Sequence, residues 1–222
     1  MRHLYKTLVS LTGMRGQPQT EQVDTGRVAQ PHESGSLKTA LGAAFLEDPV
    51  FGWLIGGSSR RQARLEQFFA LQLAHALADG CVWTSDGLHG AALCMPPGRW
   101  RLPPRSMIAN GRRYTGVFRA RLPRAIGLLT ALERRHLRGA HYYFPYIGVT
   151  PAAQGRGLGS SLMRPALDRC DREGLPAYLE ASSERNAALY ERLGFQHVGV
   201  LRFAGSPPLM LMERPPQPRP TH

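Results

Sequence analysis

Residues 146–163, "YIGVTPAAQGRGLGSSLM", place three glycines at alternate positions between an apolar run and an apolar helical pattern. Glycine adopts positive φ without a steric penalty, and its bare backbone lets another group approach closely. The first turn of a helix also offers unpaired N–H groups and a partial positive charge. The sequence therefore predicts a strand, a turn over residues 154–160 that binds a pyrophosphate, and a helix over residues 157–172.

Two familiar phosphate motifs do not match this turn. No Gly-Lys-Ser/Thr follows, which excludes the P-loop, and the spacing is G-x-G-x-G in place of the dinucleotide G-x-G-x-x-G. Glu180 lies about 20 residues farther on, so spacing alone does not fully exclude a dinucleotide site. A turn that needs small residues only for helix packing is the alternative interpretation.

The rest of the chain alternates patterns typical of helices and strands. Helices are predicted around residues 37–45, 60–79 and 186–194, and Asp48-Pro49 is expected to end the first of them. Pro145 predicts an edge, a bulge or a splayed position in its strand. The mixed order favours an α/β or α+β layer architecture with a mixed sheet. The predicted strands are residues 22–29, 81–85, 88–95, 142–149, 176–181, 195–200 and 208–213.

Composition narrows the class of protein. The chain has 222 residues and 42% hydrophobic residues, so we expect a single domain over residues 22–213, a disordered extension over 1–21 and a Pro-rich tail over 214–222. No run reaches the ~18 apolar residues of a membrane helix, and a cytoplasmic location is expected. Three distant cysteines without a C-x-x-C pattern predict neither a disulfide framework nor a zinc site.

The net charge is +12, and residues 99–138 contain eleven arginines and one acid, Glu133. A solvated helical face is one interpretation, and a surface that attracts a polyanion is the other. The stretch lacks interleaved aromatic residues and a nucleic-acid motif, so a nucleic-acid partner is not expected. A phosphate-bearing cofactor or an acidic partner remains open.

The glycine turn and its flanks resemble the acetyl-CoA-binding signature of the GNAT superfamily of N-acetyltransferases. That signature has Val-x-Pro and then Gln/Arg-x-x-Gly-x-Gly/Ala, which here are Val149, Pro151, Gln154, Gly157 and Gly159. Residues 177–195, "AYLEASSERNAALYERLGF", resemble the family's next strand, Asn-bearing turn, Tyr-bearing helix and Leu-Gly-Phe close. The match runs from about residue 142 to 200 and is most similar to the puromycin N-acetyltransferase-like branch.

The resemblance implies a mostly antiparallel central sheet, flanked by helices, in which a splayed strand pair receives acetyl-CoA. The pantetheine arm would pair with the strand backbone and the pyrophosphate would lie on the turn. The implied cofactor-binding residues are Ile147, Gly148, Val149, Gln154, Gly155, Arg156, Gly157, Leu158, Gly159, Ser160 and Asn186.

Acetyl transfer to an amine needs a neutral amine, a polarised thioester and a protonated leaving thiolate. By resemblance Tyr190 is the candidate acid, and a phenol with a pKa near ~10 suits a thiolate. Asn186 and Tyr190 are four residues apart on one helix face, and their alternative roles are a helix cap and a core ring. Glu180 is the candidate base, with a structural carboxylate as its alternative. Water and His141 are the other candidate bases, and His141 is expected at the surface.

The acceptor lies in the half of the chain that resembles the family least. The resemblance implies direct transfer, in a ternary complex, to a primary amine of a small molecule. The alternatives are a protein lysine or N-terminus, for which an acidic peptide suits residues 99–138, and a catalytically silent module that binds CoA or nucleic acid. No metal or membrane partner is expected, and a homodimer is left open. Phe51, Trp53 and Trp100 are candidates for either the acceptor pocket or the core.

Overall fold

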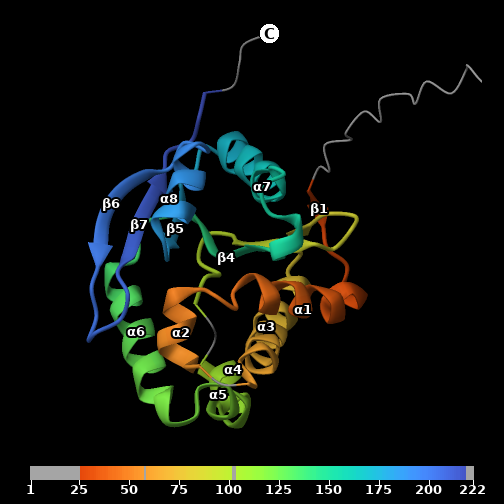
Figure 1. Cartoon of the computed structure of the whole chain (residues 1–222). Helices are drawn as coiled ribbons and strands as arrows, with labels where there is room; N and C mark the ends of the chain where they lie inside the picture. The colour runs from red at the N-terminus through yellow and green to blue at the C-terminus, as the bar shows by residue number, and fades with distance from the viewer. Residues whose placement is uncertain (1–25, 58, 102–103, 219–222) are drawn as a thin grey trace, which may run out of the picture.

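The computed structural model describes residues 26–57, 59–101 and 104–218, so the predicted extension over 1–21 and the last four residues of the tail lie outside it. Its centre is a seven-stranded sheet in the order β1-β2-β3-β4-β5-β7-β6 (Figure 1). Neighbouring strands are antiparallel except β4 and β5, which are parallel. The strands are β1 Arg27–Val28, β2 Val82–Thr84, β3 Gly90–Met95, β4 Tyr142–Val149, β5 Ala177–Ala181, β6 Gln196–Leu201 and β7 Leu209–Arg214.

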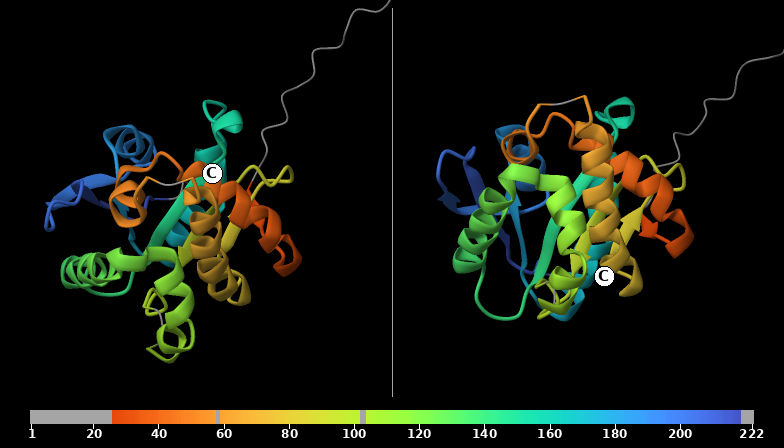
Figure 2. Two further views of the ribbon diagram at one scale, coloured as in Figure 1. Left: turned by 60° about the horizontal axis from the view of Figure 1, so that its bottom comes forward. Right: turned by 90° about the horizontal axis from the view of Figure 1, so that it is seen from below.

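Helices cover both faces of this sheet. Seen from below, α3, α5 and α6 lie in front of the sheet (Figure 2), whereas α7 and α8 lie on its other side in Figure 1. The α-helices are α1 Ser34–Ala44, α2 Pro49–Ile55, α3 Arg61–Ala78, α4 Pro104–Ala109, α5 Gly111–Phe118, α6 Leu122–Arg135, α7 Leu158–Glu173 and α8 Glu184–Glu191. Short 3₁₀ turns are η1 Pro31–Glu33, η2 Arg119–Arg121 and η3 Pro151–Ala153.

The sheet separates two apolar clusters because successive side chains of a strand point to opposite faces. On β5, Tyr178 belongs to the cluster with α1, α2, α3, α5 and α6, whereas Leu179 belongs to the cluster with α7 and α8. Two completely buried residues show the two faces, Phe69 of α3 in the first cluster and Met163 of α7 in the second. The mixed, mostly antiparallel sheet flanked by helices confirms the predicted fold class.

The helix boundaries follow from capping residues, and one of them corrects a prediction. The predicted helix over 60–79 is α3, followed by Gly80 at φ +63°. The sequence predicted that Asp48-Pro49 ends the first helix, but this prediction is wrong, because α1 has already ended at Ala44. Asp48 instead caps the start of α2, its side chain accepting from the Phe51 amide, and Pro49 takes the first helical position. No helix of the described residues is long and apolar enough to cross a membrane.

Candidate active site

The strands β4 and β5 separate after a short contact. Their pairing covers Tyr142 with Ala177 and Tyr143 with Tyr178, and no pair follows along β4. On its other side, β4 pairs with β3 in a register that shifts between Leu93 and Met95, opposite Pro145. Proline cannot donate to a ladder, so the strand bulges there. The predicted irregularity at Pro145 is confirmed, and it lies two residues beyond the last pair of β4 and β5, where the gap between these two parallel strands begins.

The glycine turn lies at the carboxyl end of β4, beside this gap. Gly155 has φ +81° and Gly157, the N-cap of α7, has φ +75°. A Cβ on either would meet nothing within 4 Å, so open space faces the turn. In the described part of the chain, no backbone amide of residues 155–159 donates to a protein acceptor. Free amides, a helix N-terminus and open space fit a pyrophosphate. The third glycine has a packing role, because a Cβ on Gly159 would lie 3.3 Å from Leu189 Cδ2.

Polar contacts connect the turn with β4 and α8. The Gln154 Nε2 donates to the Val149 carbonyl at 3.0 Å, and its Oε1 accepts from Arg185 Nη2 at 3.2 Å. Gln154 therefore holds the end of β4 to the start of α8, and the Val149 carbonyl has a protein donor. Arg156 is exposed, Leu158 is buried, and the Ser160 amide donates to the Gly157 carbonyl.

The remaining predicted residues of β4 pack on opposite faces. Ile147 packs against the α7 cluster. Gly148 faces α1, where a Cβ would lie 2.8 Å from Phe45 Cε2 and 2.9 Å from Ala44 Cβ. Gly148 thus lets α1 approach the strand, and any contact with a cofactor arm would come from its backbone.

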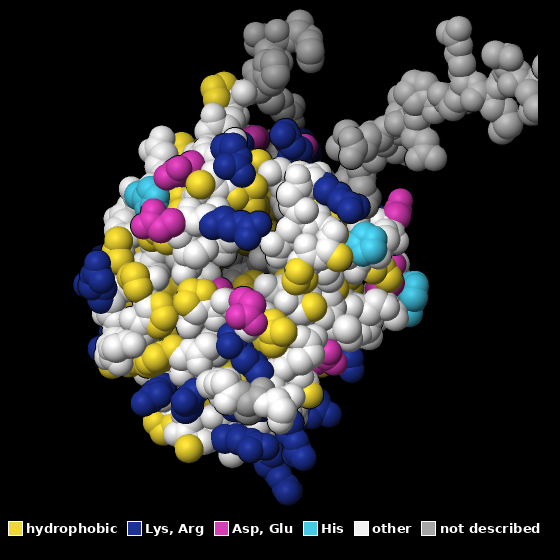
Figure 3. Space-filling model, in the orientation of Figure 1, with side chains coloured by type: hydrophobic (Ala, Val, Ile, Leu, Met, Phe, Trp, Pro, Cys, Tyr) yellow, Lys and Arg dark blue, Asp and Glu magenta, His cyan; other side chains and the backbone are white. Residues whose placement is uncertain are grey.

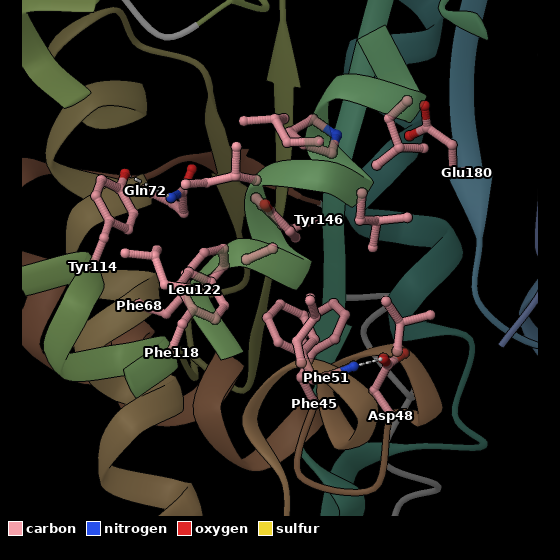
Figure 4. Close-up of a pocket in the computed structure, with 18 of the residues that line it drawn as sticks. Phe45, Asp48, Phe51, Phe68, Gln72, Tyr114, Phe118, Leu122, Tyr146 and Glu180 are labelled. Carbon is pink, nitrogen blue, oxygen red and sulfur yellow. Dashed lines mark hydrogen bonds between the residues drawn. The ribbon is translucent and has the colours of Figure 1, made fainter. Parts of the chain in front are cut away.

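A cavity of about 400 Å³ lies on the α1–α6 side of the sheet and reaches the bulge of β4. Its walls are largely apolar and aromatic, with rings from α2, α3, α5 and β4 and from Phe45, which follows α1. Figure 4 shows the carboxylates of Asp48 and Glu180 on one side of the pocket and the rings of Phe68, Tyr114 and Phe118 across from them. In the described part of the chain, these two carboxylates are its charged lining groups. The labelled lining residues are Phe45, Asp48, Phe51, Phe68, Gln72, Tyr114, Phe118, Leu122, Tyr146 and Glu180.

Glu180 has the electrostatic properties of a base. Its side chain is 7% exposed, and its Oε2 accepts a hydrogen bond of 2.8 Å from the Tyr143 hydroxyl. Burial raises its pKa to about 7, against the opposing effect of the Tyr143 hydrogen bond. A carboxyl that titrates near neutral pH can take a proton from an ammonium group.

Asp48 joins the cavity to the carboxyl end of β5. Its Oδ1 accepts from the Phe51 amide at 2.9 Å, and its Oδ2 accepts from Ser182 Oγ at 2.5 Å. Ser183, the next residue, caps α8 by accepting from the Asn186 amide at 3.2 Å. The N-cap of α8 is therefore Ser183, and the Asn186 side chain donates to Ser182 Oγ at 3.4 Å.

Tyr190 lies on the other side of the sheet from the cavity, in the α7 and α8 cluster, and is 5% exposed. Neither Tyr190 nor Asn186 lines the cavity. Burial, with a contribution from Asp48, raises the pKa of Tyr190, so its hydroxyl keeps its proton at neutral pH. In the described part of the chain this hydroxyl has no hydrogen-bond partner.

Several site residues were not found from the sequence, or were placed wrongly. In the sequence, Asp48 indicated only a helix boundary and was not predicted as a site residue. Phe51 lines the cavity, whereas Trp53 packs on Phe203 and Trp100 stacks on His136 at 3.7 Å between ring centroids. His141 was expected at the surface, but it is 2% exposed and bonded to His136. The burial of this histidine pair comes from the packing of Trp100, Tyr143 and Tyr178 around it, which no local pattern indicates.

A splayed parallel pair, with a glycine turn at its open end, defines the fold of the acyl-CoA-dependent acetyltransferases. The model of the acetyltransferase (GNAT) family matches residues 92–195. An uncharacterised N-acetyltransferase of Schizosaccharomyces pombe is 31% identical over an alignment of 194 positions that covers 78% of this chain and 76% of that protein. The chain therefore belongs to the GNAT family and is an acetyltransferase.

Solved structures agree with this assignment. A Corynebacterium glutamicum protein described as a histone acetyltransferase and related acetyltransferase has a TM-score of 0.65 and 26% identity, covering 89% of this chain and 98% of that one. The Drosophila melanogaster polyamine N-acetyltransferase has a TM-score of 0.60, covers 86% of this chain and 99% of its own, and is 20% identical. The second likeness supports the fold alone.

Proposed function

We propose that this acetyltransferase transfers the acetyl group of acetyl-CoA directly to the primary amine of a small molecule with an apolar body. The observation that carries the proposal is the apolar cavity beside the gap between β4 and β5, with Glu180 and Asp48 on one wall. Carboxylates among aromatic rings favour a cationic amine attached to an apolar group. The resemblance to the puromycin N-acetyltransferase-like branch also favours a small acceptor.

The glycine turn is suited to hold the cofactor. The free amides of residues 155–159 would bind the pyrophosphate, and the unpaired edge of β4 near Ile147 and Val149 would hold the amide arm. Acetyl-CoA, when bound, supplies an activated thioester. Arg156, which is exposed beside the turn, adds a positive charge.

The side chains of the site divide the proton transfers between them. Glu180 accepts the proton of the substrate ammonium, which leaves the electron pair on nitrogen for attack on the acetyl carbon. Asp48 holds positive charge near the cavity wall. Tyr190 keeps its proton at neutral pH and gives it to the departing sulfur, and Asn186 positions the cofactor arm from the same helix face.

The proposal predicts a selectivity among amines. Primary arylalkylamines and alkylamines should be acetylated with kcat/KM at least about tenfold above that for a linear polyamine, since each extra buried cationic group costs more than one decade. The measurement is thiol release from acetyl-CoA with a panel of matched amines, with the corresponding alcohols as controls. Preference for polyamines would contradict an apolar acceptor.

A protein acceptor is the rival supported by a specific observation. Lys and Arg side chains gather at the lower end of the molecule in Figure 3, over α4 and α5. Arg105, Arg112 and Arg113 are exposed on these helices, and an acidic peptide suits such a surface. Adding acidic peptides with a free N-terminus or lysine to the panel separates the two acceptors. Peptide turnover that exceeds turnover of every small amine would replace our proposal.

Replacing Tyr190 by phenylalanine is expected to lower kcat about tenfold and to leave acetyl-CoA affinity unchanged, because water protonates a thiolate less well than a positioned phenol. Tyr142→Phe is the matched control, since Tyr142 is also buried on the α7 side but donates its hydroxyl to Glu173. Steady-state kinetics and acetyl-CoA titration of both variants check the prediction. Equal kcat values for the two variants would remove Tyr190 from the mechanism.

We propose residues 22–213 as the acetyltransferase domain and the cytoplasm as its place of action. The last strand along the chain, β7, ends one residue beyond this range at Arg214, whose guanidinium donates to both carboxylate oxygens of Asp171.

A further inference from the structure

The carboxyl of Glu180 has one satisfied oxygen and one unsatisfied oxygen. The Tyr143 hydroxyl donates to Oε2, whereas Oε1 is buried and has no hydrogen-bond partner in the described part of the chain. A buried ionised carboxylate oxygen without a donor is costly. A protonated carboxyl would instead need an acceptor for its new hydroxyl group.

Two groups lie near this carboxyl, the hydroxyl of Tyr178, which also lacks a hydrogen-bond partner in the described residues, and the ring of His136, whose nitrogen faces Oε1. His136 follows the last residue of α6, is 8% exposed, and places its Nδ1 3.9 Å from Glu180 Oε1. Trp100 stacks on the ring and covers it. Burial, with contributions from His141 and Arg101, lowers the pKa of His136 to about 4, so the ring is neutral at pH 7. A neutral imidazole has one N–H and one lone pair, and its partners decide which nitrogen carries each.

His141 decides the tautomer of His136. Its Nδ1 lies 2.8 Å from the Gly139 carbonyl oxygen, which can only accept, so His141 Nδ1 carries a hydrogen. In the neutral His141 ring, Nε2 is then an acceptor, and it lies 2.9 Å from His136 Nε2. Toward this acceptor His136 donates through Nε2, which leaves the lone pair on Nδ1 facing Glu180, whereas a doubly protonated His141 would impose the opposite tautomer.

We propose that His136, held in this tautomer by His141, accepts the hydrogen bond of protonated Glu180 and thereby positions Glu180 as the base. The lone pair of His136 Nδ1 repels the ionised carboxylate, and it accepts a hydrogen bond from the protonated carboxyl. The gap of 3.9 Å is about 1 Å longer than a hydrogen bond, and a small rotation of the carboxyl closes it.

The proton transfer that this arrangement assists is balanced. An N–H bond of the substrate ammonium breaks and an O–H bond forms at Glu180 Oε1, while the electron pair stays on the amine nitrogen. The new O–H donates to His136 Nδ1, and no proton needs to move to the histidine. The titratable and charged groups around the pair are Tyr143, Tyr146, Tyr178, Asp48, Arg101 and Glu133.

The role of His136 rests on the proposed function, but its tautomer can be tested without any turnover. Nitrogen NMR of the full chain with ¹⁵N-labelled histidine reports which ring nitrogen is protonated at pH 7. We expect His136 to carry its hydrogen on Nε2 and a lone pair on Nδ1. A hydrogen on His136 Nδ1 in the wild-type protein would overturn the proposal.

Two substitutions of His141 test the consequence for Glu180. His141→Phe releases the tautomer, so His136 can donate from Nδ1 to the carboxylate, and the pKa of Glu180 should fall by about 1 unit. His141→Gln keeps an acceptor for His136 and a donor for Gly139, so the pKa should stay near that of the wild type. Carbon NMR titration with ¹³C-labelled glutamate, assigned with Glu180→Gln, measures this without substrate.

The apparent pKa on the acidic side of the pH profile of kcat/KM should shift by the same amount as the pKa of Glu180 measured by NMR. An unchanged pKa in His141→Phe, or an equal fall in His141→Gln, would refute the positioning role, because a merely structural role changes stability and not this titration. If the pKa moves as expected but no amine is acetylated, the proposed function fails while the assignment of His136 stands.

Discussion

Replacing Glu180 by glutamine is expected to lower kcat/KM for the amine about 10²- to 10⁴-fold, with acetyl-CoA binding unchanged. Glutamine keeps an acceptor for the Tyr143 hydroxyl but cannot take a proton. Because burial raises the pKa of Glu180 to about 7, wild-type kcat/KM should rise with pH to a plateau above about 7, and the variant should lack this limb. Steady-state kinetics from pH 5 to 9 and acetyl-CoA titration measure both effects.

The same variant should be more stable than the wild type at alkaline pH. The carboxyl has an ordinary pKa of 4.5, and burial raises it to about 7 in the folded protein. The folded state thus binds more protons in this window, and wild-type stability is lost as pH rises through it. Glutamine does not titrate, so the variant avoids this loss. Its free energy of unfolding should exceed that of the wild type by up to about 3 kcal/mol at pH 8 and by almost nothing at pH 4.

Glu213→Gln is the matched control for both measurements. Glu213 lies on the neighbouring strand β7, opposite Tyr178, and does not line the cavity. Its replacement should leave the pH profile and the alkaline stability close to those of the wild type. Loss of activity in the control, or full activity in Glu180→Gln, would exclude Glu180 as the base.

Replacing Gly157 by valine is expected to weaken acetyl-CoA binding about 100-fold. Gly157 has φ +75°, where a β-branched residue is strained by about 1–3 kcal/mol, and its side chain would fill the space in front of the free amides. The strain lowers the stability of the free and the bound protein alike, so the loss of two decades in affinity, at about 1.4 kcal/mol for each, comes from the contacts that the valine side chain blocks. Isothermal titration with acetyl-CoA gives the affinity directly.

The other end of the same helix supplies the control. Gly174 follows α7 with φ +65°, and a Cβ there also meets nothing within 4 Å. Gly174→Val should therefore lose a similar amount of stability and keep its affinity for acetyl-CoA. If both variants bind acetyl-CoA as the wild type does, the turn is not the pyrophosphate site.

The sequence predicted the parts of the site that lie within one strand–turn–helix unit. Alternate glycines, Pro145 and the apolar periodicity after Gly157 act over a few residues, so their patterns survive in the sequence. The structure confirms a bulge at Pro145, a helix start at Gly157, and a splay between β4 and β5.

The rest of the site depends on contacts between distant segments. Asp48 caps α2 and also bonds Ser182, which is 134 residues away along the chain. His136 and His141 are close in sequence but come into line with Glu180 only through the pairing of β4 and β5. The cavity combines residues from five helices, three strands and the loops between them, and the periodicity of the helices and strands marks those residues as core.

The most direct test of the account is thermal unfolding of the wild-type chain with and without acetyl-CoA, with NAD and ATP as controls. At a ligand concentration about 100 times the Kd, binding should add about 2.7 kcal/mol to the free energy of unfolding. We expect a clear rise in Tm with acetyl-CoA and little or none with NAD. A folded protein whose Tm is unchanged by acetyl-CoA would contradict the assignment of the glycine turn as a cofactor site.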